Sequence, residues 1–427
     1  MAYKPVDAIE VRIWSRRAGA IAVDPALGCY AFEYAPEFRI SGIEVAPLTM
    51  PLAAASEPFA FPALPRATFL GLPGAIADAL PDDFGNALID AWLAREGVEK
   101  TAVTPLDRLA YMGRRAMGAM EFKPARALPA APTAIEMAEL VENARRAVRG
   151  DFGSDALARA ALAQIIQVGT SAGGARAKAA IAWNPKTKEI RAGQFDVDPG
   201  FEHWLLKLDG MGTDKELGPG EHYGRVEYAY HLMARAAGIT MTACRLLEES
   251  GRAHFMTRRF DRDGNTKIHT QSLCAMAHLD FRQRATHDVS QWFQTMRRLN
   301  MDYPAIEEAY RRVAFNVMAA NCDDHTKNTS FLLREGGRWE LAPAYDLTHA
   351  HNPNGEWTYQ HLMSVNGKFN AITRGDLLAV AGESGIGTGP AVLAKVEKAI
   401  KAWPTYARKA GLAAAEIRRI AADHRGG

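Results

Sequence analysis

The chain has 427 residues, of which 48% are hydrophobic and 23% are charged, and its formal net charge is +2. That length accommodates two or three domains, and the composition is that of a globular enzyme. A charge this close to zero does not indicate a protein drawn to nucleic acid or to an anionic membrane by its overall charge. The sequence contains no uncharged apolar run that approaches the roughly 20 residues of a membrane-spanning helix.

The cysteines are widely separated along the chain, at Cys29, Cys244, Cys274 and Cys322. No two of them form a C-x-x-C pair, which argues against a structural zinc site and a disulfide framework and favours a reducing compartment. Residues 1–10 lack the basic-then-apolar pattern of a secretion signal. Together these features predict a cytoplasmic protein.

Taken in chain order, residues 1–125 predict a mixed α/β module. Its predicted elements are strands at residues 11–13, 20–23 and 29–34, and a helix at 84–96. An Ala/Pro-rich stretch at 124–133 is typical of a linker, and a helix is predicted after it at 134–149.

Residues 160–260 alternate glycine-rich turns with strand-like runs, and from Ser272 onward the apolar spacing is mainly helical. The predicted helices of this second half are at 289–299, 303–321, 391–403 and 413–424. Strands followed by helices predict an α+β fold with a mostly helical second half. A cleft between two such lobes is a natural place for a nucleotide.

The most informative stretch reads NCDDHTKN over residues 321–328 and is followed by APAYD at 342–346. Asp323 and Asn328 have the D-x-x-x-x-N spacing of a kinase catalytic loop. Asp346 follows a strand pair predicted at 329–333 and 339–341, which is where a kinase has its magnesium-binding aspartate.

Phosphoryl transfer needs one carboxylate that accepts the hydroxyl proton, and an amide and a second carboxylate that hold the metal. Asp323, Asn328 and Asp346 supply these groups. Asp324 is the rival base, but its offset to Asn328 is four rather than five, so Asp323 is preferred. His325 is expected to orient the loop rather than react, since a lone histidine is more often structural.

A loop of small residues reads GTSAGGARAK over residues 169–178 and leads into a strand predicted at 179–183. Small side chains let backbone N–H groups approach phosphate oxygens. The loop does not match G-x-x-x-x-G-K-[ST] and precedes a strand rather than a helix, which excludes a P-loop NTPase. Taken alone, it is best interpreted as a hairpin turn.

Three further features follow that loop in the order in which a kinase has them. Lys207 lies in a predicted strand and is either a solvated surface residue or a ligand of the ATP phosphates. Glu227 opens a predicted amphipathic helix over 226–237 and either pairs with Lys207 or faces the helix dipole. Residues 254–262 predict a strand and turn, which is by default a plain hairpin and is alternatively a connector that contacts adenine.

With these motifs in place, the chain resembles the HipA family of serine/threonine kinases, the toxins of type II toxin–antitoxin pairs. The resemblance rests on SAGGARAK at 171–178, LLK at 205–207, RFDR at 259–262, residues 321–328 and the pair Tyr345-Asp346. It implies a protein-kinase-like, two-lobe α+β architecture with an extra N-terminal subdomain. The expected domains are an N-terminal subdomain at 1–125, a small lobe with the phosphate loop at 126–262, and a helical C-terminal lobe with the catalytic loop at 263–427.

The resemblance also implies residue roles. Asp323 and Lys207 are expected to be catalytic, Asn328 and Asp346 to bind Mg²⁺, and Ser171 to be autophosphorylated. The residues expected to contact ATP or its metal are Gly173, Gly174, Ala175, Arg176, Ala177, Lys178, Lys207, Glu227, Arg258, Arg259, Phe260, His325, Lys327, Asn328, Tyr345 and Asp346. A phosphoserine adds roughly −1.5 to −2 charges at pH 7 and is expected to repel ATP phosphates beside it.

The partners implied by the resemblance are a small helix-turn-helix antitoxin like HipB and operator DNA, which is bound mainly through that antitoxin. The implied substrate is a translation-related protein of the aminoacyl-tRNA synthetase class, and the implied biological role is that of a toxin linked to persistence. Two alternatives remain from the residues themselves. One is a metal-dependent hydrolase that uses the acidic and imidazole groups at Asp323, Asp324, His325, Asp346, His349 and His351. The other is a catalytically inactive kinase-fold binding module.

Overall fold

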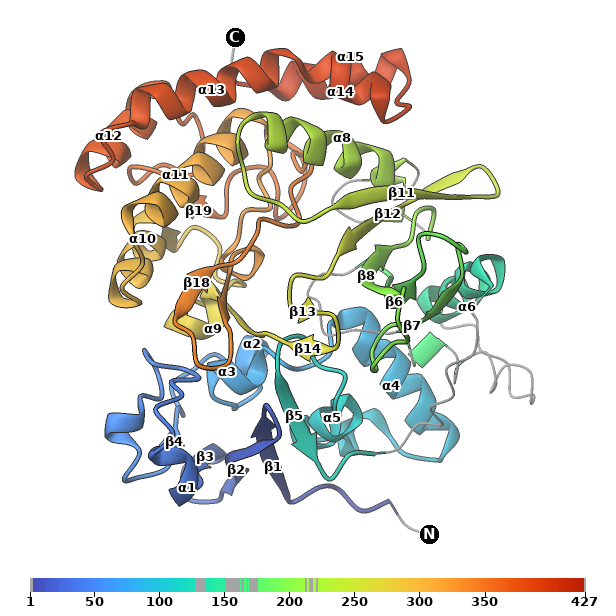
Figure 1. The fold of residues 1–427 in the computed structure, drawn as a ribbon, viewed down its shortest axis with the longest axis vertical. Helices are drawn as coiled ribbons and strands as arrows, with labels where there is room; N and C mark the ends of the chain where they lie inside the picture. Colours follow the sequence, from blue (N-terminus) through green and yellow to red (C-terminus); the bar gives the residue numbers. More distant parts are fainter. Residues whose placement is uncertain are drawn as a thin grey trace. The chain divides into compact units, whose positions relative to one another are not determined.

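The computed structural model describes residues 3–126, 136–149, 162, 165, 166, 168, 176–211, 213, 214, 218, 219 and 222–425 (Figure 1). The chain forms two compact units that are interleaved in sequence. Unit 1 comprises Met1–Met211, Arg258–Gln271 and Leu332–Arg338, and unit 2 comprises Gly212–Thr257, Ser272–Phe331 and Trp339–Gly427. The division predicted at residues 125 and 262 stays a prediction. None of the helices in the described part of the chain combines the length and the apolar run that crossing a bilayer requires.

Unit 1 begins with an antiparallel sheet in the order β4-β3-β2-β1-β5. Its strands are β1 (Ala8–Ile13), β2 (Arg16–Asp24), β3 (Cys29–Tyr34), β4 (Phe59–Ala60) and β5 (Met120–Lys123). Ile9, Val11 and Ile13 alternate along β1 and are at most 1% exposed, because every second side chain of a strand faces the same side. The three strands predicted here are confirmed, each within longer or equal bounds.

The α-helices in the described first part of unit 1 are α1 (Pro36–Arg39), α2 (Arg66–Phe69), α3 (Gly74–Ala77), α4 (Asp83–Arg95), α5 (Pro105–Met112) and α6 (Met137–Arg149). The predicted helices at 84–96 and 134–149 correspond to α4 and α6. Asp82 caps α4 by accepting a hydrogen bond from the backbone N–H of Gly85 at 2.6 Å. Thr104 and Asp107 form a capping box that starts α5, a helix the sequence pattern did not predict.

The remaining strands of unit 1 include an antiparallel set in the order β7-β6-β8, formed by β6 (Lys178–Trp183), β7 (Ile190–Ala192) and β8 (Glu202–Lys207). Every residue of β6 is buried, which explains the run of small and apolar side chains that follows Lys178. A short hairpin pairs β13 (Arg262–Asp263) with β14 (Thr266–Lys267). The strand predicted over 254–262 is shorter in the structure. It corresponds to β12 (Arg252–Arg258), which ends at Arg258, and the next strand, β13, begins at Arg262.

Unit 2 is mainly helical. Its helices are α8 (Tyr223–Ala236), α9 (Leu273–Ala277), α10 (Val289–Arg298), α11 (Tyr303–Met318), α12 (Arg374–Glu383), α13 (Gly389–Lys401), α14 (Trp403–Lys409) and α15 (Ala414–Asp423). Figure 1 shows α11 and α8 lying beneath the row formed by α13 and α14, and these helices pack on one another. The ring of Tyr230 joins them, with edge contacts to Phe315 at 6.1 Å and to Trp403 at 5.3 Å.

Most of the described strands of unit 2 are two or three residues long. These strands comprise β9 (Thr213–Asp214), β10 (Gly218–Pro219), β11 (Cys244–Glu249), β12, β16 (His287–Asp288), β18 (Trp339–Leu341) and β19 (Met363–Ser364). Two further strands, β15 (His269–Ser272) and β17 (Ser330–Leu333), contain residues of both units, as does β12, whose last residue, Arg258, belongs to unit 1. The predicted strand pair at 329–333 and 339–341 corresponds to β17 and β18. Helix α12 was not predicted.

Candidate functional site

The end of α11 delivers the chain into the loop formed by residues 321–328. Asp302 caps the start of α11 by accepting from the N–H of Ala305 at 3.2 Å. The helix ends at Met318, three residues earlier than predicted, because Ala320 takes the left-handed conformation with φ +53°. Beyond it, the N–H of Cys322 donates to the oxygen of Ala350 at 2.9 Å. The loop therefore starts from a fixed position.

Asn328 closes loop 321–328 on itself. Its side-chain Nδ2 donates to the backbone oxygen of Asp323 at 2.7 Å, and its own N–H donates to the oxygen of His325 at 2.9 Å within the turn Thr326–Asn328. The side chain of Asp323 is 46% exposed, and its Oδ1 lies 3.7 Å from Nε2 of His325. Because Nδ2 of Asn328 is used inside the loop, Oδ1 is the amide atom left for a cation.

Asp324 has the opposite environment from Asp323. Its side chain is 8% exposed, and both carboxylate oxygens accept hydrogen bonds, Oδ2 from Nδ1 of His361 at 2.8 Å and Oδ1 from the N–H of Leu362 at 2.7 Å. Burial alone lowers the pKa of His361, but the Asp324 carboxylate outweighs it and raises that pKa to about 10. The two adjacent aspartates therefore differ in environment. The Asp323 carboxylate is exposed, whereas the Asp324 carboxylate is buried and hydrogen-bonded.

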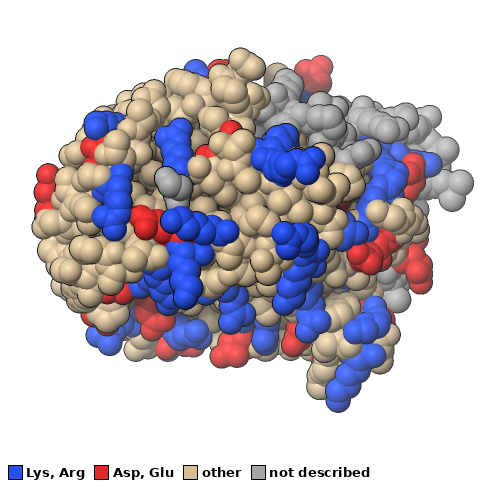
Figure 2. Space-filling view, turned by 90° about the horizontal axis from the view of Figure 1, so that it is seen from above, with Lys and Arg blue, Asp and Glu red and all other residues tan. Residues whose placement is uncertain are grey.

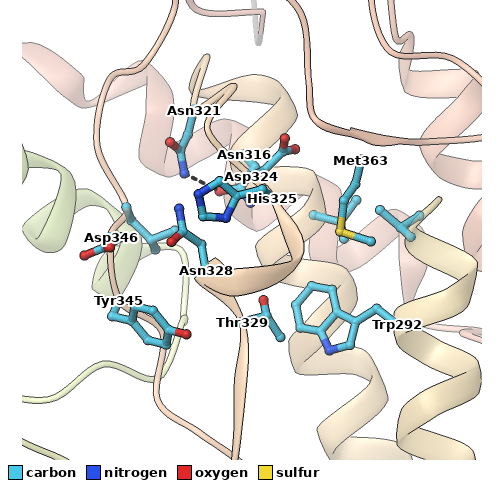
Figure 3. Close-up of a pocket in the computed structure, with 13 residues that line it drawn as sticks. Trp292, Asn316, Asn321, Asp324, His325, Asn328, Thr329, Tyr345, Asp346 and Met363 are labelled. Atoms are coloured by element: carbon cyan, nitrogen blue, oxygen red, sulfur yellow. Dashed lines mark hydrogen bonds between the residues drawn. The ribbon is translucent and has the colours of Figure 1, made fainter. Parts of the chain in front are cut away.

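A pocket of about 380 Å³, part of it open to solvent, adjoins loop 321–328 within unit 2 (Figure 3). Its polar lining comprises Asn316, Asn321, Asp324, His325, Asn328, Thr329, Tyr345 and Asp346, and its apolar lining comprises Val289, Trp292, Val313, Leu347 and Met363. Figure 3 shows the Asn328 amide beside the His325 ring, while the Asp346 carboxylate points away from that ring. Asp323 does not line this pocket.

Asp346 and Tyr345 are held next to the turn Thr326–Asn328. The Tyr345 hydroxyl donates to the oxygen of Lys327 at 2.9 Å and lies 2.5 Å from Oγ of Ser330. Asp346 has φ +54°, a left-handed conformation that aspartate and asparagine tolerate better than most residues. Nζ of Lys327 lies 5.4 Å from the centroid of the Phe281 ring, a cation–π contact.

The residues predicted to bind phosphate lie in unit 1. Ser171, Gly173, Gly174 and Ala175 are outside the described residues. Arg176 and Ala177 precede β6, and the strand begins at Lys178 rather than at Ala179. Lys178 is 3% exposed, with Nζ 3.9 Å from Oδ2 of Asp82, and it is the register partner of Lys207 at the end of β8.

The predicted adenine connector contains one side chain that is bound in the core of unit 1. The guanidinium of Arg259 donates to Asp261 from Nε at 2.8 Å and from Nη2 at 2.7 Å, and the N–H of Arg259 donates to the oxygen of His203. Arg258 is exposed and Phe260 is half-buried. In unit 2, Glu227 lies on α8 and is 3% exposed. The pairing of Glu227 with Lys207 stays a prediction.

The ligands of the alternative hydrolase site have other partners. Nε2 of His349 lies 2.8 Å from Oδ2 of Asp423, and Nδ1 of His351 lies 3.4 Å from Oδ1 of the same carboxylate. Asp324 is bound by His361 and Leu362 as described above. Across the described part of the chain, no group of three or more His, Cys, Asp or Glu side chains is arranged to hold a metal ion. This geometry does not favour a metal-dependent hydrolase.

Sequence reasoning missed His361, Leu362 and Trp292. His361 and Leu362 are 37 and 38 positions from Asp324, and no motif links them to it. Trp292 follows the apolar spacing of α10, which predicts burial and says nothing of the pocket that it lines. Only the three-dimensional structure identifies these residues.

The sequence matches the family model of the HipA N-terminal domain over residues 9–123 and that of the HipA-like C-terminal domain over residues 170–425. No curated protein matches it.

Among solved structures, the fold is similar to a chain of the Shewanella oneidensis MR-1 toxin–antitoxin complex of HipA, HipB and operator DNA. That chain is 17% identical, the match covers 97% of this chain and 95% of that one, and the TM-score is 0.68. A second match is the Helicobacter pylori proinflammatory kinase CtkA, which is 11% identical. The match covers 59% of this chain and 90% of that one with a TM-score of 0.34, and we draw no conclusion from it. With family models covering both its N-terminal and its C-terminal part, and with the HipA fold, this chain belongs to the HipA family.

Proposed function

We propose that this HipA family member is an ATP- and Mg²⁺-dependent serine/threonine protein kinase that acts as the toxin of a toxin–antitoxin pair. One observation carries the proposal: Asn328 donates to the backbone oxygen of Asp323 at 2.7 Å, the Asp323 carboxylate is 46% exposed, and Asn328 and Asp346 both line one pocket. A proton acceptor that meets a protein substrate must be accessible, whereas the neighbouring Asp324 is enclosed.

The donor set fits magnesium. Mg²⁺ prefers oxygen ligands, retains several waters and is held in kinases by one or two protein groups together with substrate phosphates. Asn328 Oδ1 and the Asp346 carboxylate are two such groups. When bound, the metal supplies charge neutralisation for the β- and γ-phosphates.

In the proposed reaction, a serine or threonine hydroxyl oxygen of the substrate forms a bond to the γ-phosphorus of ATP. The bond from that phosphorus to the β–γ bridging oxygen breaks, and ADP leaves with the electron pair. Asp323 orients the hydroxyl and takes its proton. Lys207 and residues 173–178 are proposed to bind the phosphates, and Lys327 to offset negative charge.

Ser171 is proposed as the autophosphorylation site, and an aminoacyl-tRNA synthetase as the class of protein substrate. The Shewanella relative is in a complex with HipB and operator DNA, which supports a HipB-like antitoxin as partner here.

Helices α13–α15 carry exposed basic side chains at Lys395, Lys398, Lys401, Arg408, Lys409, Arg418 and Arg419. Figure 2 looks onto the helices drawn at the top of Figure 1 and shows Lys and Arg side chains spread over that face. Such a surface is compatible with phosphate contacts in addition to DNA binding through the antitoxin.

The test uses γ-labelled ATP with the purified protein and a cell lysate. Wild type should label itself and a lysate protein, and Asp323→Asn should label neither, while Asp302→Asn, an exposed carboxylate that only caps α11, should behave as wild type. EDTA should abolish labelling and added Mg²⁺ should restore it. Ser171→Ala should abolish self-labelling and spare the lysate protein. Transfer that persists undiminished in Asp323→Asn would contradict the proposal.

A further inference from the structure

His361 contacts the residues on both sides of Asp323. Its Nδ1 lies 2.8 Å from Oδ2 of Asp324, and its Nε2 lies 3.9 Å from Sγ of Cys322. The backbone of the next residue adds a third contact, since the N–H of Leu362 donates to Oδ1 of Asp324 at 2.7 Å. One imidazole ring therefore fixes the positions immediately before and after the proposed proton acceptor.

The backbone that carries this ring is itself anchored. His361 and Leu362 immediately precede β19, which pairs in parallel with β16 in the register His287↔Met363. Oγ of Ser364 in β19 donates to Oδ2 of Asp288 at 2.6 Å, and Asp288 also caps α10. The N–H of His361 donates to the oxygen of Phe369 at 2.8 Å. The contacts that reach loop 321–328 thus come from two residues directly before a paired strand, which anchors them.

The contact is charged and enclosed. The side chains of His361 and Asp324 are 1% and 8% exposed, so water competes little for either partner. With both ring nitrogens protonated, Nδ1 donates to the carboxylate and Nε2 donates to the sulfur of Cys322. A charge-assisted hydrogen bond of this kind is shorter and stronger than a neutral one, which suits it to fixing a loop.

We propose that His361, through Asp324 and Cys322, is the positioning residue that holds the Asp323 carboxylate in place for proton transfer. His361 does not contact substrate and is not a catalytic residue. The inference rests on the proposed kinase function for its kinetic consequence, but its structural consequence, an ordered loop 321–328, is independent of any activity.

The experiment compares His361→Gln and Asp324→Asn with wild type and with a matched control, Asp376→Asn. Asp376 is also a buried carboxylate of unit 2 that accepts several hydrogen bonds, from Thr373, Asn366 and Lys368, but it has no contact with loop 321–328. Two quantities are measured: hydrogen exchange of the peptide covering residues 321–328, and the kcat and KM for ATP in phosphate transfer.

Both loop variants should exchange faster in residues 321–328 than wild type and should lose about 10- to 100-fold in kcat, since small displacements of a reacting group have effects of that size. Their KM for ATP should stay within about twofold of wild type, because the described contacts of the ring are with Asp324 and Cys322, neither of which is proposed to bind ATP. Asp376→Asn should change neither the exchange of this peptide nor kcat.

If His361→Gln does not fold, the nearly isosteric Asp324→Asn decides the question by the same two measurements. Wild-type exchange in residues 321–328 together with wild-type kcat in that variant overturns the inference. If wild type transfers no phosphate at all, the proposed function fails, and the exchange measurement alone then supports or overturns the role of His361 in ordering the loop.

Discussion

The side-chain Nδ2 of Asn328 donates a 2.7 Å hydrogen bond to the backbone oxygen of Asp323, so the residue proposed to bind metal also closes the loop that carries the proposed base. These two roles use different atoms of one amide. They can therefore be separated by substitution.

Asn328→Asp keeps an oxygen ligand for a cation but places a carboxylate oxygen against the backbone oxygen of Asp323. We expect phosphate transfer to fall by about 100-fold, because the loop geometry is lost, and the free energy of unfolding to fall by about 1 kcal/mol. Steady-state kinetics and urea unfolding measure the two effects. Asn300→Asp is the control, since Asn300 is exposed and its φ of +56° is tolerated by aspartate. Activity within twofold of wild type in Asn328→Asp would show that this hydrogen bond is dispensable.

The His361–Asp324 pair predicts a pH dependence of stability. Burial lowers and Asp324 more strongly raises the pKa of His361, to about 10, against about 6.5 for an unfolded histidine. Its contribution to stability is fully present below pH 6.5 and is lost as the pH rises through 10, because the folded state holds a proton that the unfolded state releases. The difference in unfolding free energy between wild type and Asp324→Asn should therefore shrink over that range.

The pH dependence of wild type alone is not sufficient, because Lys267 changes the unfolding free energy with pH in the opposite direction. Burial lowers the pKa of Lys267 to about 8, so its contribution makes folding more favourable as the pH rises from 8 toward 10.5. Lys267 is present in both proteins and cancels in the difference. A wild-type-minus-variant difference that is flat from pH 6.5 to 10 would contradict the charged state assigned to His361. Urea titrations at five pH values suffice.

Tyr345 tests how the chain before Asp346 is held. Tyr345→Phe leaves the oxygen of Lys327 and Oγ of Ser330 without this partner, and we expect a loss of about 1–3 kcal/mol in unfolding free energy. Mg²⁺ dependence of phosphate transfer should also shift to higher concentration, since Asp346 is the next residue. Tyr359→Phe, at a tyrosine that is 42% exposed, should be neutral in both measurements. Equal behaviour of the two variants would rule out this role.

Unit 1 contains a buried charge cluster that should dominate its stability. Asp261 accepts from Arg259, from Arg262 at 2.8 Å and from the N–H of Gly118 at 2.9 Å. Burial alone raises the pKa of Asp261, but the two guanidiniums hold it well below its usual range. We expect Asp261→Asn to lower the free energy of unfolding by about 3–5 kcal/mol, because two buried cations lose their counter-charge.

The same cluster should make wild type sensitive to acid. A depressed pKa contributes stability above the unfolded value of about 3.9 and loses it as the pH falls below that value. Asp263→Asn is the control, since that neighbouring carboxylate is exposed. Thermal melts at pH 7 and pH 3.5 compare the variants. If Asp261→Asn had the same melting temperature as Asp263→Asn, the cluster would have no net stabilising role.

The sequence predicted the parts of the site that are local in the chain. Asp323, Asn328 and Asp346 lie within 24 consecutive residues. The helix before them and the strand pair between Asn328 and Asp346 follow ordinary hydrophobic periodicity and turn chemistry. The choice of Asp323 over Asp324 rested on that spacing alone and stays a prediction, and the structure shows that the two side chains differ in exposure, at 46% and 8%.

What the sequence could not predict are partners that only tertiary folding brings together. His349 and His351 had been candidates for a metal site with nearby acids, yet both bind Asp423, more than 70 positions away. Lys178 belongs to a motif predicted to contact phosphate, and its ammonium lies 3.9 Å from Asp82, which no local pattern connects to it. Long-range ion pairs of this kind leave no periodic trace in a sequence.

The left-handed backbone at Asp346 has a practical consequence for saturation mutagenesis at that position. Most substitutions there would strain the backbone, whatever the chemistry of the new side chain. β-Branched residues would be strained most, and glycine would be accommodated most easily. Asparagine is the one replacement that keeps both the shape and the backbone preference while discarding the negative charge. A library screened without regard to this would attribute to lost chemistry many failures that are steric in origin.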